Sequence, residues 1–483
     1  MKRKILLLNP GYHEFGDYGY YHQSPMGLLK IGSYFKKTNK EVHFIDCSIP
    51  PKLMDTGCNL KEYYKDAPFV RMVKCGNHEN EGISKAQKYY GLPHRIIRER
   101  VKSINPTEVW VGSGLTYYWE SVRDCIDIIK DTIPGVPVLL GGIYPTLYPD
   151  HASNNTRADY IHIGPLDDID DELPDYSLYG NQQIETSRTI QLGKGCNVNP
   201  PCSFCAVVAM DPKFRSLAPD KVFDYILHEH RNRSVSFFRI WSSQLLVPKP
   251  RFIDLMTKIV DSKIKISMVA SEGVQPSLFD QNVSDLMYKA GFYSVSIPME
   301  SIDSSRVEEF RKPGDFNDYE AAVRCAQKTG FKTIKSFVMI GVPGQSIDEM
   351  VHGIVDCWAR DVSPALHQYT PIPGSHDWTR FPQFHNISPE ELHPSLWPAA
   401  NKDMTVEALE EIKKIAKIGP YRLYYAIKSG VEVRVPEVWD MFKKWCISYK
   451  IMKPNFSPTF ERPLALPGYT SSWTDHCKKV GII

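Results

Sequence analysis

The sequence predicts an α/β protein built from two consecutive strand-and-helix series and a mainly helical C-terminal region. Short apolar runs alternate with amphipathic stretches over residues 1–165, and the same rhythm begins again at residue 188. Such alternation is typical of parallel sheets that are covered by helices. The chain has 483 residues, which is more than one ordinary core accommodates, so several domains are expected.

The first series contains five candidate strands, with Gly, Pro, Asn or Asp at or near each carboxyl end. These strands are KILLLNP, EVHFIDC, EVWVGSG, VPVLLGG and ADYIHIG. Open parallel sheets bind their ligands at the carboxyl ends of the strands. The sequence therefore predicts a doubly wound, Rossmann-like domain over residues 1–165, with a ligand site above residues 9–11, 113–116 and 141–142.

The second series, over residues 188–377, contains six strand-and-helix units. Their strands are RTIQLG, VSFFRIWSS, IKISMVASEG, YSVSIPMES, TIKSFVMIGVPG and PALHQYTPIPG. Six right-handed units in a row favour a partial (β/α)6 barrel of the TIM type over a second open sheet. The acidic segment 166–187, which contains Pro and Gly but no periodicity, is interpreted as a linker. Residues 378–483 do not show this alternation of apolar runs and amphipathic stretches, and they are interpreted as a mainly helical domain.

Composition excludes several classes of protein. The chain is 42% apolar and 24% charged with a net charge of +2, so no basic excess attracts nucleic acid. No run approaches the roughly 18 apolar residues of a membrane span, and no cleavage site follows the short apolar run near the start. Eleven cysteines without a secretory signal argue against a disulfide framework. We expect a cytoplasmic protein whose cysteines are free thiols or metal ligands.

The stretch GKGCNVNPPCSFCAV carries the clearest chemical signal. Cys196, Cys202 and Cys205 are separated by five and two residues. Three thiolates on one loop can bind three irons of a cubane cluster and leave the fourth iron open for reaction. The alternative is a zinc site completed by His228 or His230, but closed zinc sites usually pair two ligand-bearing turns. The cysteines follow the first barrel strand, where catalytic residues belong, which favours a [4Fe-4S] cluster.

With these cysteines the sequence resembles the radical S-adenosylmethionine (SAM) superfamily, whose members bind SAM at the open iron. The usual family spacing is three residues and then two, so the five-residue first gap is a departure seen in only a few members. The resemblance implies that Cys196, Cys202 and Cys205 hold the cluster. It also implies that Phe204 packs against the SAM adenine, the alternative being an ordinary core Phe.

Three further motifs occur in the order that the family has. IPMES resembles the fourth-strand motif whose acidic residue contacts SAM, which implies a cofactor role for Glu300 and Ser301, with Lys312 at a position where many members carry Lys. The alternative for Glu300 is a solvated charge at a strand end. GVPG and PIPGS resemble the fifth- and sixth-strand motifs, which places Gly341 and Pro373 near SAM.

Two positions depart from the family pattern. The second strand ends in Ser242-Ser243-Gln244 where relatives often carry a pair of Asp, and the third ends at Glu272 where relatives often carry Arg. We therefore expect Gln244 and Glu272 to face either SAM or a distinctive substrate.

Residues 1–165 resemble the cobalamin-binding domain that precedes the barrel in one large radical SAM subfamily. The resemblance rests on SPMGLL (24–29), GSGLT (112–116) and GGIYPT (141–146), and it implies cobalamin contacts from Gly112, Ser113, Leu115, Thr116, Gly141, Gly142 and Tyr144. Glycines would let the backbone approach a flat macrocycle closely. Tight turns are the alternative for the glycines, and packing on the sheet edge is the alternative for Tyr144. The Asp-x-His-x-x-Gly motif is absent, so no histidine from it is expected on cobalt.

Together these resemblances imply an anaerobic radical SAM enzyme with a [4Fe-4S] cluster, SAM and cobalamin, reduced by a ferredoxin- or flavodoxin-type donor. The implied activity is C-methyl transfer to an unactivated carbon by way of a 5′-deoxyadenosyl radical and methylcobalamin. A peptide or protein substrate is favoured, because no lipid-facing amphipathic segment is visible. The alternatives are cyclisation, rearrangement or oxidation on the same architecture, and a non-enzymatic corrinoid or metal carrier.

Overall fold

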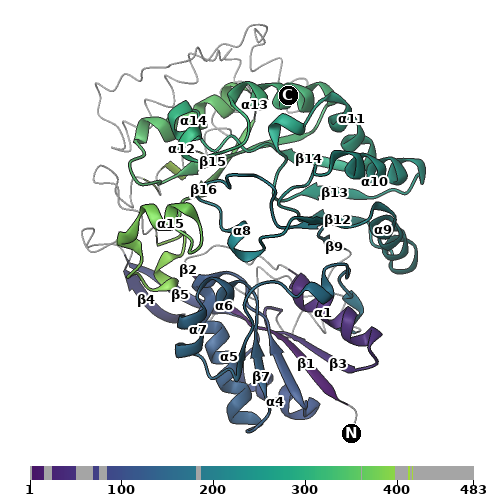
Figure 1. The fold of residues 1–483 in the computed structure, drawn as a ribbon, viewed down its shortest axis with the longest axis vertical. Helices are drawn as coiled ribbons and strands as arrows, with labels where there is room; N and C mark the ends of the chain where they lie inside the picture. The colour runs from purple at the N-terminus through teal and green to yellow at the C-terminus, as the bar shows by residue number, and fades with distance from the viewer. Residues whose placement is uncertain are drawn as a thin grey trace, which may run out of the picture.

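The computed structural model describes residues 3–15, 24–49, 69–74, 84–180, 187–360 and 362–396, together with the isolated positions 409, 412, 413 and 416. Two parallel sheets dominate this part of the chain, one below the other in Figure 1, with the short helix α8 (Val207–Met210) between them. The predicted α/β class is confirmed.

The N-terminal sheet contains all five predicted strands. They are β1 (Lys4–Asn9), β3 (Glu41–Asp46), β6 (Glu108–Val111), β7 (Val138–Leu140) and β8 (Tyr160–Ile161), all parallel in the order β3-β1-β6-β7-β8. The order of strands reverses between β1 and β6. In doubly wound sheets, this switch point is where a crevice opens for ligands.

Helices cover both faces of this sheet. In β1, Leu6 and Leu8 pack toward α4 (His94–Ile104) and α5 (Trp119–Thr132), whereas Ile5 and Leu7 pack toward α1 (Met26–Lys37). All four side chains are fully buried. A strand that is buried on both faces must be apolar throughout, which explains why its sequence shows a continuous run instead of alternation.

The second sheet contains the six predicted barrel strands. They are β9 (Ser187–Ile190), β12 (Phe237–Ile240), β13 (Ser267–Ala270), β14 (Phe292–Ser296), β15 (Thr333–Ile340) and β16 (Ser363–Gln368). Each strand pairs in parallel with its neighbour along the chain, and β9 and β16 form the two edges. The sheet is therefore the predicted partial barrel.

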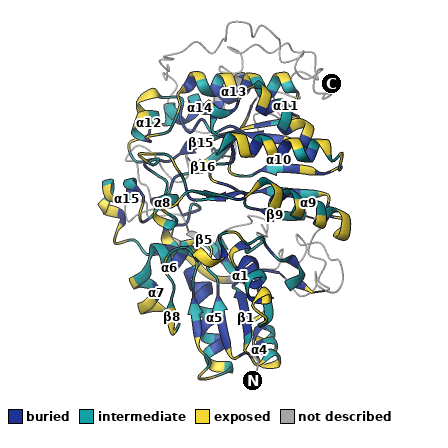
Figure 2. Ribbon diagram, turned by 45° about the vertical axis from the view of Figure 1, so that its right-hand side comes forward, coloured by how far each residue is buried: buried dark blue, intermediate teal, exposed yellow. Residues whose placement is uncertain are grey.

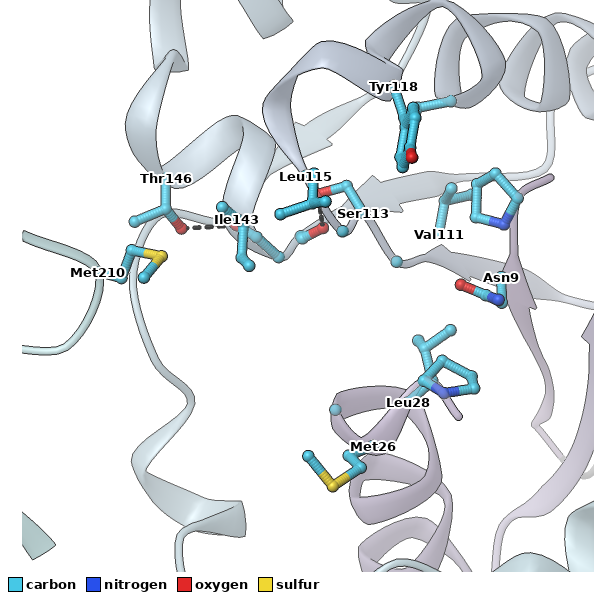
Figure 3. Close-up of a pocket in the computed structure, with 18 of the residues that line it drawn as sticks. Asn9, Met26, Leu28, Val111, Ser113, Leu115, Tyr118, Ile143, Thr146 and Met210 are labelled. Atoms are coloured by element: carbon cyan, nitrogen blue, oxygen red, sulfur yellow. Dashed lines mark hydrogen bonds between the residues drawn. The ribbon is translucent and has the colours of Figure 1, made fainter. Parts of the chain in front are cut away.

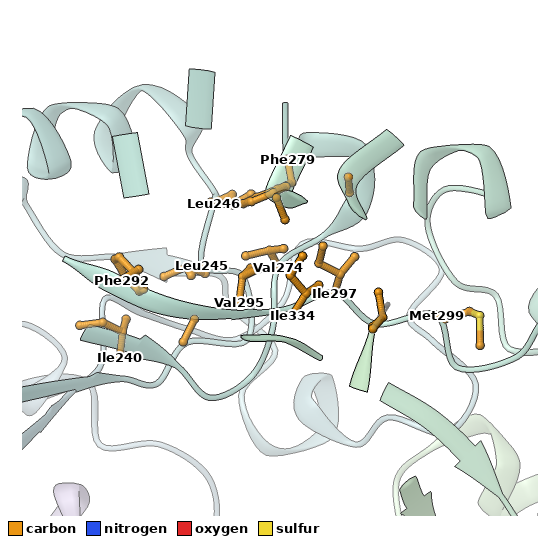
Figure 4. Packing of buried hydrophobic residues seen from close by; sticks show 14 of the residues in the cluster. Ile240, Leu245, Leu246, Val274, Phe279, Phe292, Val295, Ile297, Met299 and Ile334 are labelled. Atoms are coloured by element: carbon orange, nitrogen blue, oxygen red, sulfur yellow. The ribbon is translucent and has the colours of Figure 1, made fainter. Parts of the chain in front are cut away.

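Six helices alternate with these strands; five of them pack apolar side chains against the sheet, with their exposed faces outward, and the short helix over Ser304–Glu309 has no buried residue (Figure 2). They are α9 (Pro219–Arg233), α10 (Lys249–Asp261), α11 (Gln281–Ala290), α12 (Ser304–Glu309), α13 (Phe316–Thr329) and α14 (Ile347–Ala359). Figure 4 shows the core between sheet and helices, where Ile240, Phe279 and Phe292 are almost fully buried. Local signals fix helix ends: Asp280 caps α11 through the Val283 amide, and Gly291, with φ 108°, ends it.

A third, antiparallel sheet was not predicted. Strands β2 (Tyr12–Phe15), β4 (Phe69–Lys74) and β5 (Ser84–Tyr90) pair in the order β2-β5-β4. The ammonium of Lys85 in β5 donates to the Ser395 carbonyl, and Phe15 joins the apolar cluster of the barrel. This sheet therefore ties the N-terminal domain to the chain that follows the barrel.

Residues 166–180 of the predicted linker, 166–187, form a packed connector, which we call the strap. Its Tyr176 hydroxyl accepts from the Thr189 amide at 2.9 Å and donates to the Thr189 carbonyl at 3.2 Å. Thr189 lies in β9, the barrel edge. The Tyr179 hydroxyl donates to Asp46, at the end of β3, at 2.8 Å. Side chains of the strap thus bond to both parallel sheets.

After β16 the described chain forms α15 (His376–Arg380) and two short 3-10 turns, at Pro382–Phe384 and Pro389–Leu392. Most of the predicted C-terminal helical domain, residues 378–483, lies outside the described residues. Among the helices that are described, none has the length and apolar character of a bilayer-crossing segment.

Replacing Tyr176 with Phe tests whether the hydrogen bonds between the strap and β9 stabilise the fold. The change leaves the buried amide and carbonyl of Thr189 without their partner, which costs about 1–3 kcal/mol. We expect a lower urea midpoint of unfolding. Tyr160→Phe is the matched control, because that tyrosine is 62% exposed in β8. Equal midpoints for the two variants would show that the strap contact contributes nothing to stability.

Candidate functional site

The cysteine loop is closed at its base by a small hairpin. Strands β10 (Gly193–Lys194) and β11 (Arg215–Ser216) pair in antiparallel fashion on either side of it. Gly195 has φ 71°, and a Cβ there would lie 2.3 Å from the Lys213 carbonyl oxygen. Only glycine fits both the left-handed backbone and this close approach. The sequence Gly-Lys-Gly-Cys therefore specifies how the chain enters the loop.

Arg215, in β11 at the C-terminal end of the cysteine loop, forms several contacts that stabilise the loop. Its guanidinium donates to Asp211 at 2.8 Å and to the Lys213 carbonyl at 2.7 Å, and it also pairs with Asp170 of the strap. Lys194, at the near end, pairs with the same Asp170 carboxylate at 3.2 Å. Both ends of the loop are thus fastened to one residue of the strap.

The three cysteines lie half-buried on this loop. Their thiols are near enough to one another to interact electrostatically. Burial raises the pKa of Cys202 to about 12 and raises that of Cys205 as well. A bound cation reverses this effect, because it stabilises the thiolate. Cys202 and Cys205 are therefore soft ligands whose ionisation a bound metal would favour.

The zinc alternative does not match this arrangement. His230 Nδ1 bonds to the Val235 carbonyl and His228 Nδ1 bonds to Asn232, all at or beside the C-terminal end of α9. Within the described residues, no three His, Cys, Asp or Glu side chains are grouped as ligands of a single ion. A cubane gives each thiolate its own iron, so it does not require the cysteines to converge on one point.

Gln244 bonds directly to the cysteine loop. Its Nε2 donates to Cys196 Sγ at 3.2 Å. Its Oε1 is buried, and it has no hydrogen-bond partner within the described part of the chain. A buried amide oxygen without a partner is costly, so this atom is available to a donor on a bound molecule. Glu272, the other departure from the family pattern, is exposed after β13, yet surrounding protein raises its carboxyl pKa by desolvation.

Glu300 forms a buried ion pair beside the cysteines. Its Oε1 lies 2.7 Å from Lys312 Nζ, and both side chains are close to fully buried. The backbone of Glu300 has φ 65°, and it bonds to β15 through the Phe337 carbonyl and the Met339 amide. A left-handed glutamate held by neighbouring backbone is a strained conformation of the kind that gathers at functional sites. Its carboxylate also interacts electrostatically with Cys202 and Cys205.

Other residues predicted from the barrel motifs have contacts inside the protein. The Ser301 hydroxyl donates to Glu349 at 2.8 Å, and Phe204 packs edge-on against Phe310. Gly341 follows β15 with φ 80°. Pro373 is buried in a loop that packs against α8: a Cβ on its neighbour Gly374 would lie 2.5 Å from the Ala209 Cβ.

A cavity of about 820 Å³ opens at the switch point of the N-terminal sheet. Figure 3 shows Met26 and Leu28 of α1 on one side of it, and Leu115, Ile143 and Thr146 on the other. The crevice predicted above residues 9–11, 113–116 and 141–142 is at this position. Of the residues predicted for cobalamin, the cavity is lined by Gly112, Ser113, Leu115, Gly141 and Gly142.

Thr116 and Tyr144 do not line the cavity. Tyr144 is fully buried in the core, where its hydroxyl bonds to His151 Nδ1 at 2.8 Å and its ring lies near Trp119. The structure therefore favours packing, the alternative reading, over corrin contact for Tyr144. Thr116 begins the 3-10 helix η1 (Thr116–Tyr118).

Neighbouring atoms of the protein limit the space for a side chain at two of these glycines. Gly142 has φ 104°, and a Cβ there would lie 2.3 Å from the Ser113 carbonyl oxygen, while a Cβ on Gly112 would lie 2.9 Å from Leu28. By contrast, a Cβ on Gly114 would have open space around it. Gly142 is thus needed for the shape of the wall, whether or not a ligand touches it, whereas a Cβ on Gly112 would meet only the flexible Leu28 side chain.

Residues distant in the sequence complete the cavity, and sequence reasoning missed them. The barrel contributes Gln191, Lys194, Met210 and Trp241, and the chain after the barrel contributes His393 and Ser395. The cavity wall therefore includes residues of both parallel-sheet domains. No motif marks these residues, because their proximity arises only when the domains dock.

One wall of the cavity is a hydrogen-bonded group formed by Glu14, Tyr118 and His393. The Glu14 carboxylate accepts from the Tyr118 hydroxyl at 2.7 Å and from the Phe15 amide at 2.9 Å, and it pairs with His393 Nε2 at 3.0 Å. His393 Nδ1 accepts from the Ser395 amide, which places the ring proton on Nε2. Burial alone would raise the pKa of Glu14, but these hydrogen bonds lower it below its ordinary value.

Comparison with known proteins agrees with this geometry. Residues 190–354 match the Radical SAM superfamily. This segment is therefore a radical SAM domain. A search of curated proteins gave no match.

Solved structures match over both parallel-sheet domains. The radical SAM methyltransferase TsrM from Kitasatospora setae, with cobalamin and a [4Fe-4S] cluster bound, has a TM-score of 0.56 at 14% identity, covering 80% of this chain and 76% of TsrM. TsrM with tryptophan substrate and a SAM analogue gives 0.58 at 15%, covering 80% and 77%. The cobalamin-dependent SAM radical enzyme OxsB gives 0.53 at 11%, covering 82% of this chain and 55% of OxsB. The chain thus has the fold of cobalamin-binding radical SAM enzymes.

Proposed function

We propose that this chain is a cobalamin-dependent radical SAM C-methyltransferase that acts on an unactivated carbon. The observation that carries the proposal is a single cavity whose wall includes the carboxyl edge of the Rossmann-like sheet and residues of the radical SAM barrel. Methyl transfer through two cofactors requires that both reach one enclosed space. The TsrM structures support the proposal, since TsrM is a methyltransferase that shares this fold.

The residues present fit the three cofactors. Cys196, Cys202 and Cys205 offer three thiolates to a [4Fe-4S] cluster, and the unpaired Gln244 oxygen beside them offers an acceptor to SAM. The cavity, with Ser113 and Leu115 in its wall, would hold cobalamin. When bound, the cluster and SAM supply a hydrogen-abstracting radical, and cobalamin supplies the methyl group.

The chain itself supplies position, charge and shielding from water. The Lys312 ammonium holds the Glu300 carboxylate in place beside the cysteines. The group of Glu14, Tyr118 and His393 closes one side of the cavity with satisfied hydrogen bonds, so this wall keeps its shape without water. A dry cavity protects reactive species from side reactions with solvent.

The proposal also includes a peptide or protein side chain as the methyl acceptor, and a ferredoxin- or flavodoxin-type protein as the electron donor. A second candidate is a cyclisation, rearrangement or oxidation on the same architecture. The similarity to OxsB supports this second candidate. OxsB shares the fold, and it is described as a cobalamin-dependent SAM radical enzyme without mention of methyl transfer.

Product analysis of the anaerobically reconstituted protein tests the proposal. With reductant, cobalamin and SAM carrying a deuterated methyl group, we expect S-adenosylhomocysteine and 5′-deoxyadenosine by mass spectrometry, with the label in the corrinoid fraction. Protein reconstituted without cobalamin is the control and should form no S-adenosylhomocysteine. Formation of 5′-deoxyadenosine alone in the complete mixture would contradict methyl transfer and favour the second candidate.

Replacing Glu300 with Gln tests the SAM site. The carboxylate is placed to accept a charge-assisted hydrogen bond worth about 1.5–3 kcal/mol, so its loss should weaken SAM binding about ten- to a hundred-fold in isothermal titration. Iron content should not change, whereas Cys205→Ser should lose iron. Glu229→Gln is the matched control, since Glu229 is also a buried glutamate in an ion pair, with Arg188 at 2.7 Å. Unchanged SAM affinity in Glu300→Gln would mean that Glu300 serves only to pair Lys312.

A further inference from the structure

Lys30 is a buried lysine that lines the cavity. It lies in α1, directly after the segment SPMGLL, and only 2% of its surface is exposed. Lysine is almost never buried to this degree unless it is paired. Within the described part of the chain, no side chain or backbone group forms a hydrogen bond or ion pair with its ammonium.

The carboxylates nearest to Lys30 are already engaged by other cations. Asp170 of the strap pairs with Lys194 and Arg215. Glu172, also of the strap, bonds to two other side chains of α1, those of residues 33 and 37. Neither carboxylate is close enough to Lys30 for an ion pair. The charge of Lys30 is therefore not neutralised by direct contact.

The environment of Lys30 disfavours its charged form. Burial is the largest cause, and the ammonium groups of Lys194 in β10 and Lys221 in α9 act in the same direction, against Asp170 and Glu172. Together they lower the pKa of Lys30 to about 7. An anion in the cavity would restore the proton, because an opposite charge stabilises the ammonium form.

The N-terminal end of α1 faces the same cavity. Residues 24–28 line it, and no side chain caps the helix. The first amide groups of a helix carry partial positive charge and favour anions. Lys30 and the helix terminus thus present positive charge to one space from two independent sources.

We propose that Lys30 is the cation of an oxyanion-binding site in the cavity. Two molecules could supply the oxyanion: a substrate with a carboxylate, or cobalamin through the phosphodiester of its nucleotide tail. The link to substrate or cobalamin rests on the proposed function, whereas the anion site itself rests on the placement of Lys30.

Anion binding at Lys30 should depend on pH. At pH 8 the ligand-free ammonium is largely deprotonated, so anion binding must take up a proton. Affinity should be constant below pH 7 and fall about tenfold per pH unit above it, until the pKa of the bound state is reached. Titration calorimetry of the wild-type protein in buffers with different ionisation enthalpies measures this proton uptake directly.

Lys30→Met is the variant that tests the site, with Lys36→Met as the matched control on the same helix. Lys36 pairs with Asp175 on the outer side of α1. The unfolding midpoint of Lys30→Met should not fall, because the substitution removes a buried charge that lacks a partner. The probes are cobalamin, cobinamide, which lacks the phosphate and nucleotide, and succinate added to cobalamin-loaded protein or to ligand-free protein.

Each outcome decides one question. If Lys30→Met weakens cobalamin binding ten- to a hundred-fold but leaves cobinamide binding unchanged, the oxyanion is the cobalamin phosphate. If both corrinoids bind normally and only succinate binding weakens, the site recognises a substrate carboxylate. If all probes bind both variants alike and the wild-type protein takes up no proton, the proposal is overturned. Failure of the wild-type protein to bind any corrinoid would contradict the proposed function, while the succinate measurement on ligand-free protein would still decide the anion site.

Discussion

The contacts of Asp170 connect the parts of this protein on which its chemistry depends. This one carboxylate of the strap pairs with Lys194 at one end of the cysteine loop and with Arg215 at the other. Tyr176 and Tyr179 of the strap bond to β9 and to the end of β3. Because parallel sheets present their ligands at the carboxyl ends of strands, a shared cavity exists only if these two edges are held close together. The strap provides that orientation.

Charge around the cysteine loop follows from burial. The Cys202 and Cys205 thiols resist ionisation because the protein desolvates them, which raises their pKa values, and the Glu300 carboxylate pairs with Lys312 at 2.7 Å. In the cavity wall, Lys30 lacks such a partner within the described residues. In a low-dielectric space a thiolate is stabilised by a nearby cation and an ammonium by a nearby anion. Both features point to bound cofactors or substrate as part of the folded structure.

Strand β1 could be predicted because it is buried on two faces and shows a continuous apolar run. Less buried strands such as β3 and β16 could be predicted from the alternation of short apolar runs with amphipathic stretches. The antiparallel sheet could not, since β5 reads SKAQKYY and owes its place to β2 and to contacts with the chain near Ser395. The cysteine loop could be predicted as a cluster site because its three cysteines are close together in the sequence. Tyr144 could be assigned to the core only from three-dimensional contacts, with His151 above all. Lys30 gave no signal, because a single lysine in an amphipathic helix normally extends its charge to water.

Cobalamin uptake by a variant with a filled cavity tests the central claim most directly. Gly114 lines the cavity, and a Cβ there meets no atom within 4 Å, so Gly114→Trp adds an indole to the cavity without a clash at the backbone. Lys102→Trp places the same group on the surface of α4. We expect wild type and Lys102→Trp to retain cobalamin absorbance through anaerobic gel filtration, and Gly114→Trp to lose it while keeping its iron. Equal retention by all three proteins, or no retention by the wild type, would contradict the claim that this cavity holds the corrinoid.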